Sequence, residues 1–315
     1  SSATSIIGCS CEVAAGKTVT IQSGGVMTIT NSVTNSGGSL IFENDASLVQ
    51  LNDAAVNTGK IIYKRISSEM KDYDYTYWSS PVLDQKLNVL SPNSDGYYYS
   101  FANGNWFRED GNNFMNTAGK GFIIRVPRPG VTYSNSEYWT GTYKQPVQFE
   151  GTPYNGIIHI ATLGAAQSNL IGNPYPSAID AELFIKNANN IAMIDGALYF
   201  WTHTTARTKV GSEYVYTSND YATLNLTGAT ATTSTKAAAA SGSKIPTGYI
   251  AAGQSFLVDS KTAGNFEFTN SMRVSDSGKN ADFFKMGNTK KTTSTEKNRV
   301  WLNLSNSGGA FKQLL

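Results

Sequence analysis

The only imidazoles that could act as a general base in this 315-residue chain belong to His159 and His203. Nucleophilic catalysis needs a nucleophile, a base and a group that orients the base. His159 alternates with isoleucines in 157–160, which predicts a strand residue facing one side of a sheet. His203 follows the strand-like run 200–202, where it would close a hydrogen bond or line a groove. The chain has no Gly-x-Ser-x-Gly elbow, His-Glu-x-x-His helix or glycine-rich phosphate loop, so these enzyme classes are not indicated.

Carboxylates provide a second route to catalysis, because glycoside hydrolysis needs only two of them facing each other in a cleft. The candidates are Glu109, Asp110, Glu150, Asp180, Glu182 and Asp220. Asp180 and Glu182 fit the first turn of a helix, where acids favour the helix dipole. Glu109 and Asp110 precede Gly111 and resemble a turn, and Asp220 is either a turn residue or a ligand contact. The sequence alone identifies no catalytic pair.

Oxygen-rich turns make calcium the metal that this chain would bind most readily. Asn93 and Asp95, before Gly96, have the required chemistry, and Asn44-Asp45 does too. Asx-turns explain both segments equally well.

The two cysteines, Cys9 and Cys11, are too close together to close a loop and have no His or Cys cluster with which to form a zinc site. They would form a local disulfide, pair with a segment outside this chain, or act as a redox pair.

Aromatic side chains are the residues best suited to bind a sugar, because rings beside hydrogen-bonding groups form stacking platforms. Four tryptophans come into question, Trp78, Trp106, Trp139 and Trp201, and burial in strands is the simpler interpretation of most of them. Trp106 follows the turn Asn103-Gly104-Asn105 and is the best candidate for exposure. We predict that Trp106, Trp201, His203 and Asp220 contact a ligand.

The composition excludes several partners. Charged residues make up only 15%, and the net charge of +2 provides no basic stripe for nucleic acid. No run reaches the ~18–20 apolar residues of a membrane-spanning helix. The surface is polar through Ser, Thr, Asn and Gly, which is typical of secreted β proteins. If the protein is exported, its signal peptide has already been removed.

The elements that must position these residues are strands. Short apolar runs recur between 17 and 51 at a spacing of about 8–10 residues, separated by Gly and Asn, which predicts a meander or a few rungs of a β-solenoid. We assign this region to residues 1–60 and expect the next domain to cap its end.

Residues 61–285 contain an internal repeat with halves at about 72–150 and 168–272. Four signals occur twice in the same order: 77–81 and 172–176, 96–101 and 196–201, 119–125 and 253–259, 147–150 and 266–269. The predicted architecture is therefore all-β, with a tandem, sandwich-like core. It includes one short helix from Ser177 to about Ala188, with Asp180 completing a capping box.

The remaining segments are connections. Residues 228–244 are low in complexity and predict an exposed mobile loop, and 286–298 predict a linker. Residues 299–315 alternate like the first strands of a further, truncated domain, so we expect a fragment of a longer protein.

Several short sequence segments are similar to segments of large secreted surface proteins of Bacteroidetes. They are 74–82, 169–176, 219–222 and 270–274, and 299–304 resembles the opening of the β domain that follows in such proteins. The resemblance implies export by the type IX secretion system and a place on the outer-membrane surface, and it carries over no catalytic residues. We therefore expect a non-catalytic, secreted adhesion module without a cofactor other than calcium, binding a surface, a glycan or a protein. The alternatives are a carbohydrate-binding accessory region of a polysaccharide-degrading enzyme, an enzyme in its own right, and a subunit of an extracellular fibre.

Overall fold

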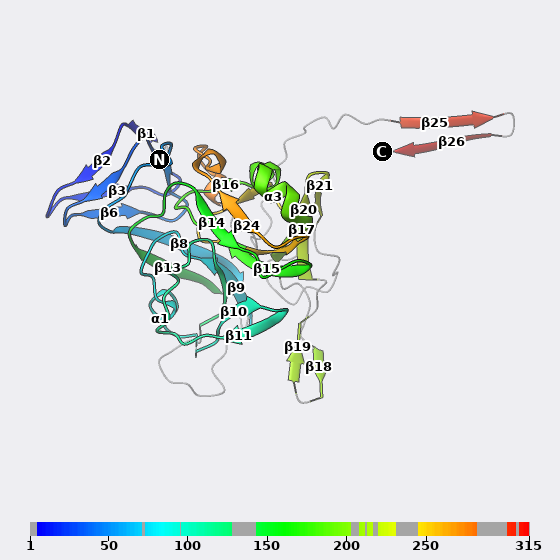
Figure 1. Ribbon diagram of the computed structural model, residues 1–315, viewed down its shortest axis with the longest axis horizontal. Coiled ribbons are helices and arrows are strands. Elements are labelled where there is room, and N and C mark those ends of the chain that lie inside the picture. Colours follow the sequence, from blue (N-terminus) through cyan, green and yellow to red (C-terminus); the bar gives the residue numbers. More distant parts are fainter. Residues whose placement is uncertain are drawn as a thin grey trace.

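The computed structural model describes residues 5–70, 73–94, 96–127, 143–202, 208–211, 213–216, 220–230, 245–281, 301–306 and 309–314, with the backbone alone at 208–209, 213–215 and 301–314. Strands dominate these ranges and the helices are short, so the predicted all-β class is confirmed (Figure 1). Among these residues, no helix has the length and apolar composition that a membrane crossing requires.

Parallel pairing builds the first part of the chain into a short solenoid. Ser5 pairs with Val26 and Val26 with Ser47, so one turn of the solenoid advances the chain by 21 residues. Three sides result: β1-β4-β7, β2-β5 and β3-β6-β8. The strands are β1 (Ser5–Gly8), β2 (Cys11–Val13), β3 (Thr18–Ile21), β4 (Val26–Ile29), β5 (Val33–Asn35), β6 (Ser39–Phe42), β7 (Ser47–Gln50) and β8 (Ile61–Met70).

Apolar residues of this repeat point inward because each strand alternates around a shared core. Leu40, Phe42 and Leu48 are fully buried there. At one corner, a Cβ on Gly38 would lie 2.6 Å from the Ala14 carbonyl oxygen, so only glycine allows successive turns to stack this closely.

Strand β8 joins the solenoid to the rest of the chain. It pairs in parallel with β6, through Ile41 and Ile62, and antiparallel with β13 (Tyr143–Gly151). The same buried cluster runs from Val13 to Phe149. The core is therefore continuous across residue 60, where we predicted a domain boundary.

Two similar units follow, and they share one strand order. In the first unit, β8 pairs with β13 and the second sheet runs β9-β12-β10-β11. In the second unit, β14 pairs with β24 and the second sheet runs β15-β23-β17-β20, with β21 added at its edge. The elements of the first unit are β9 (Tyr75–Ser79), α1 (Leu87–Leu90), β10 (Tyr98–Ala102), β11 (Asn105–Arg108) and β12 (Gly121–Arg125).

The second unit carries more connecting structure than the first. Its elements are β14 (Ile158–Ala161), β15 (Gln167–Gly172), β16 (Ile179–Asp180), α2 (Ala181–Lys186), α3 (Ala188–Met193), β17 (Ile194–Trp201), β18 (Thr208–Val210), β19 (Glu213–Val215), β20 (Tyr221–Asn225), β21 (Gly228–Thr230), β22 (Tyr249–Ile250), β23 (Ser255–Ser260), β24 (Asn265–Phe268) and the single turns η2 (Asn270–Met272) and η3 (Lys279–Ala281).

Reciprocal backbone hydrogen bonds relate the two units by a pseudo-two-fold axis. Ser79 N donates to Gly253 O over 2.9 Å, and Gly172 N donates to Gly119 O over 2.8 Å. Gly119 and Gly253 have matching positive φ angles of 81° and 80°. The four paired sequence signals therefore lie at equivalent places: the residues before β12 meet the end of β15, and the residues before β23 meet the end of β9.

Three predicted segments differ from the structure or lie outside it. The predicted helix from Ser177 is two helices, because Asp180 is the N-cap and Asn187 ends α2 and starts α3. Gly228–Thr230 form β21, since they pair with β20, while 231–244 lie outside the described residues, as does the linker 286–298. β25 (Trp301–Asn306) and β26 (Gly309–Leu314) pair with each other as a hairpin.

We expect Gly172→Ala to destabilise the junction between the units. The added Cβ would lie 2.5 Å from Ser79 Cβ and 2.7 Å from Gln254 O. Overpacking of this kind costs about 1–3 kcal/mol, so the free energy of unfolding in urea should fall by about that amount. Gly8→Ala is the control, because nothing lies within 3.8 Å of its new Cβ. Equal urea midpoints for the two variants would contradict the close packing.

Candidate functional site

Aromatic rings from both units meet between their larger sheets. Tyr77 on β9 stacks on Trp201 of β17, with ring centroids 6.0 Å apart and planes 9° apart. On its other side, Tyr77 meets Trp106 of β11 at 6.1 Å. We name Tyr77, Trp106, Trp201 and Tyr221 the inter-sheet aromatic cluster. The structure thus brings together two of the predicted ligand-binding residues, through a tyrosine that the sequence reasoning assigned to a motif and not to the site.

Strand alternation explains why these rings gather here. On β9, Tyr75 and Tyr77 face the second unit, whereas Trp78 points the other way into the main core and is fully buried. Trp201 pairs with Tyr221 across β17 and β20, just as Phe101 pairs with Trp106 across β10 and β11. Trp106 on β11 and Tyr221 on β20 therefore occupy equivalent positions in the two units.

Exposure separates the two tryptophans. Trp201 is only 8% exposed, and its rings pack on Tyr216 and Tyr221, so it stabilises the contact between the sheets. Trp106 is 38% exposed and lies on an edge strand whose four residues are all exposed. The tight turn that precedes it has positive φ angles at Asn103 and Gly104, 50° and 73°, as expected of a two-residue hairpin loop.

The hydroxyls of the cluster are paired with each other. Tyr77 and Tyr221 share a hydrogen bond of 2.5 Å. Burial raises the pKa of Tyr77 well above its ordinary value, and burial also raises the pKa of Tyr221 to about 12. Both phenols are therefore neutral at physiological pH and hold the two sheets together.

Asp220 and His203 are the other two residues that we predicted to contact a ligand. Asp220 is fully buried, and its backbone oxygen accepts hydrogen bonds from N and Oγ1 of Thr202, at 2.9 and 2.5 Å. These hydrogen bonds join the end of β17 to the start of β20. This agrees with the first of the two interpretations of Asp220, a turn residue. His203 and Trp139 lie outside the described residues.

The predicted calcium ligands are only partly described. Asn93 is exposed, and Asp95 lies outside the described residues. The turn itself is held by Ser94, whose hydroxyl donates to the Arg125 carbonyl oxygen over 2.8 Å. Within the described ranges, no group of three or more His, Cys, Asp or Glu side chains could hold a metal ion.

The carboxylates considered for glycoside hydrolysis have local partners. Asp180 accepts from the backbone N of Glu182 and of Leu183, and Glu182 pairs with Lys186. Glu109 lies 3.6 Å from Lys120 and accepts from Asn113. Burial raises the pKa of Glu109, but the hydrogen bonds of Ser100 and Asn113 and the charge of Lys120 outweigh it, so the net shift is downward. A lowered pKa suits a structural acceptor better than a general acid.

Two of the segments that resemble the secreted surface proteins, 169–176 and 270–274, meet in a buried polar junction. Arg273 lies over the Tyr175 ring at 4.8 Å and donates to Asn270 Oδ1 at 3.1 Å and to the Leu48 carbonyl oxygen at 2.5 Å. Burial lowers the pKa of Arg273 to about 10, which still leaves it charged at neutral pH. Because Leu48 belongs to the solenoid, its hydrogen bond with Arg273 fastens the second unit to the solenoid.

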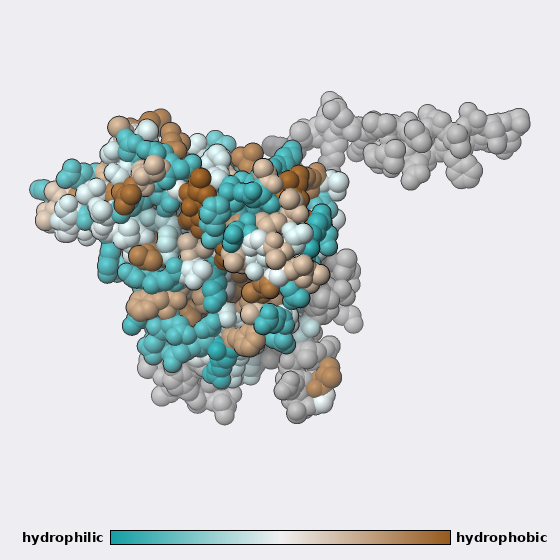
Figure 2. All heavy atoms as spheres, viewed as in Figure 1, coloured by the Kyte–Doolittle hydropathy of each residue, from teal (hydrophilic) through white to brown (hydrophobic). Residues whose placement is uncertain are grey.

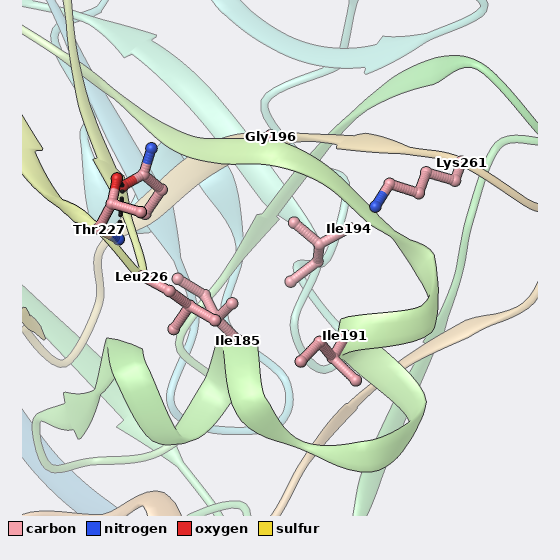
Figure 3. Close-up of a pocket in the computed structure, with 8 residues that line it drawn as sticks. Ile185, Ile191, Ile194, Gly196, Leu226, Thr227 and Lys261 are labelled. Carbon is pink, nitrogen blue, oxygen red and sulfur yellow. Dashed lines mark hydrogen bonds between the residues drawn. The ribbon is translucent and has the colours of Figure 1, made fainter.

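A small pocket lies on the second unit, away from these motifs (Figure 3). Its volume is about 240 Å³, and it is lined by Ile185, Ile191, Ile194, Gly196, Asn225, Leu226, Thr227 and Lys261. Sequence reasoning missed it, because its residues come from four separate segments. The one local signal was Leu226, an apolar residue just before the segment 228–244 that we predicted to be an exposed loop.

The chain matches a known protein family along its full length. The whole chain, residues 1–315, matches the family described as a domain of unknown function, DUF8693. The chain belongs to this family. No curated protein and no solved structure matches it. The family's description assigns no activity, so the function has to be argued from the residues of this chain.

We expect the raised pKa of Tyr221 to make the free energy of unfolding depend on pH under alkaline conditions. A neutral phenol is favoured in the folded state, so its contribution to stability is complete below pH 10 and is lost as the pH rises through about 12. The free energy of unfolding should therefore fall less steeply over this range in Tyr221→Phe than in the wild type. The slope is the readout, since loss of the Tyr77 hydrogen bond lowers stability equally at every lower pH. Identical slopes would contradict the assignment.

Proposed function

We propose that this chain is a non-catalytic extracellular adhesion module of a type IX-exported Bacteroidetes protein, and that strand β11 is its contact surface. The supporting observation is the exposure of Trp106 and Phe107 on opposite faces of one edge strand, at 38% and 48%. Large aromatic side chains are costly to leave in water, and they are the residues most often found at binding hot spots.

Polar groups beside these rings suit recognition. Asn105 and Arg108 flank the two aromatics on the same exposed strand. The Arg108 guanidinium lies 4.8 Å from the centroid of the Tyr97 ring, and its Nε donates to the Gly96 carbonyl oxygen over 2.8 Å. A preorganised arginine next to an exposed tryptophan loses little side-chain entropy when a partner binds.

The surface chemistry supports an extracellular place. Only 15% of residues are charged, and hydroxyl and amide side chains provide most of the polarity. In Figure 2, apolar residues lie in small separate groups among hydrophilic ones. The exposed aromatic residues of β11 form a contact patch of this small size.

A carbohydrate-binding accessory region is the alternative, and ring geometry distinguishes the two. Coplanar exposed rings around one groove would favour a glycan. The Trp106 ring is tilted by 73° from Tyr77 and by 64° from Phe101, whereas the coplanar pair, Tyr77 and Trp201, is buried. A single exposed tryptophan suits a contact with a protein or cell surface better than an extended sugar platform.

We expect Trp106→Ala to weaken attachment of the chain to its target surface by about thirtyfold, the loss that a hot spot of about 2 kcal/mol produces. A cell-attachment assay tests the adhesion hypothesis, and a glycan array tests the carbohydrate-binding alternative. Phe114→Ala is the matched control, because Phe114 is an exposed aromatic residue that lies outside β11, in the segment between β11 and β12. Unchanged attachment of Trp106→Ala would remove β11 from the contact surface, and specific glycan binding would support the alternative.

A fibre subunit is the second candidate function, and the edge strands of the solenoid in the described part of the chain favour it. In the described part of the chain, β1, β2 and β3 each lie at the outer edge of a sheet. Ile7 is 85% exposed, whereas its equivalent two turns later, Val49, is buried. Strands β1 and β3 carry neither a charge nor a proline, the usual protections of an edge.

If copies assemble through these edge strands, Ile7→Lys will abolish the assembly, because a charge at a strand edge opposes pairing. Analytical ultracentrifugation over a range of concentrations measures the effect. Val56→Lys is the control, since Val56 is exposed in the loop after β7 and away from the open edges. A wild-type chain that stays monomeric throughout would eliminate the fibre hypothesis for this surface.

A further inference from the structure

The pocket on the second unit is built by elements that the first unit lacks. The connection after β9 contains only the four-residue helix α1, and β11 has no third strand beside it. The equivalent positions of the second unit hold α2 with α3, and the added strand β21. These additions are not needed to complete the repeated fold, yet α2, α3 and the turn that leads into β21 contribute side chains to one pocket.

Local capping explains how the two additions are held. Asn187 caps α3 by accepting from the backbone N of Asn189 at 2.9 Å, and it donates to Glu267 on β24 at 2.8 Å. Asn190 is fully buried and donates to the carbonyl oxygens of Phe184 and Glu267. Helix α3 is therefore fixed against the sheet, and its outer residue Ile191 is left at the wall of the pocket.

The opposite wall is a tight hairpin turn. Asn225 Oδ1 accepts from Thr227 N at 2.9 Å, from Thr227 Oγ1 at 2.7 Å and from Gly228 N at 3.1 Å. This network fixes the turn between β20 and β21 and holds Leu226 toward the helices, where Figure 3 shows it beside Ile185.

The lining has an apolar middle and one cation. Ile191 and Leu226 are 48% and 46% exposed, although each faces other aliphatic side chains across the hollow. At the other end, the Lys261 side chain extends beside Ile194 (Figure 3). The lining contains no carboxylate and no aromatic ring, so it provides neither a counter-ion for the lysine nor a stacking platform for a sugar or a base.

Size limits the ligand. A volume of about 240 Å³ corresponds to about eight water molecules, at roughly 30 Å³ each. It lies below the ~300–1,000 Å³ of pockets for drug-sized ligands. A chain of about six to eight carbon atoms would fill it.

We propose that this pocket binds a medium-chain aliphatic carboxylate. The alkyl chain lies along Ile185, Leu226, Ile191 and Ile194, and the carboxylate pairs with the Lys261 ammonium. The inference is independent of the adhesion function, since β11 belongs to the first unit.

Octanoate is the probe, with octylamine as the probe of opposite charge, and binding to the full chain is measured by isothermal titration calorimetry below the micellar concentration of each. We expect saturable 1:1 binding of octanoate by the wild type and no comparable binding of octylamine. Lys261→Met should weaken octanoate binding by about tenfold or more, because it removes a charge-assisted contact. Lys261→Glu should reverse the preference toward octylamine.

Lys17→Met is the matched control, because Lys17 lies on the solenoid and outside the pocket, and it should bind octanoate as the wild type does. Leu226→Asn tests the apolar wall and should also weaken binding, with circular dichroism showing that each variant is folded. Absence of saturable binding by the folded wild type, or equal affinity for both probes, would overturn the proposal. An unchanged octanoate affinity in Lys261→Met would overturn it as well.

Discussion

The close approach of two backbone segments at the pseudo-two-fold axis is the constraint on which the rest of the structure depends. Ser79 and Gly172 each donate a backbone hydrogen bond to a glycine of the other unit, Gly253 and Gly119. Such an approach leaves no room for a side chain, since a Cβ at Gly172 would meet Ser79 at 2.5 Å. The sheets of the two units are therefore stacked with one register, and that register determines which aromatic rings meet.

Buried cations perform a second task, which is to fasten the solenoid. Arg273 reaches Leu48 from the second unit, and Arg65 on β8 pairs with Asp45 at 3.1 Å and donates to the Asn280 carbonyl oxygen at 2.9 Å. Burying a charge is expensive unless it is fully hydrogen-bonded, and these arginines use several acceptors. Leu48 lies 225 residues from Arg273 and Asn280 lies 215 residues from Arg65, so these two contacts hold the solenoid against the second unit.

Duplication also explains where the candidate sites lie. Equivalent positions in the two units, such as Trp106 and Tyr221, have different environments. Trp106 is exposed on the edge strand β11, whereas Tyr221 is half-buried and hydrogen-bonded to Tyr77. The pocket beside α3 arises from the additions to the second unit. The proposed contact surface and the pocket thus both lie where the two copies of one fold differ.

The sequence by itself determined the β class, the solenoid pattern and the four repeated signals, because strand alternation and Gly or Asn turns are local properties of the chain. It also predicted the exposure of Trp106 from the turn before it. Only the tertiary structure decided that Trp201 and Asp220 are buried, that Tyr77 lies between two tryptophans, and that Leu226 and Lys261 share a pocket. Burial and proximity depend on how distant strands stack, and that stacking is set by the glycine contacts at the pseudo-two-fold axis, where Ser79 meets Gly253 and Gly172 meets Gly119 across long separations in sequence.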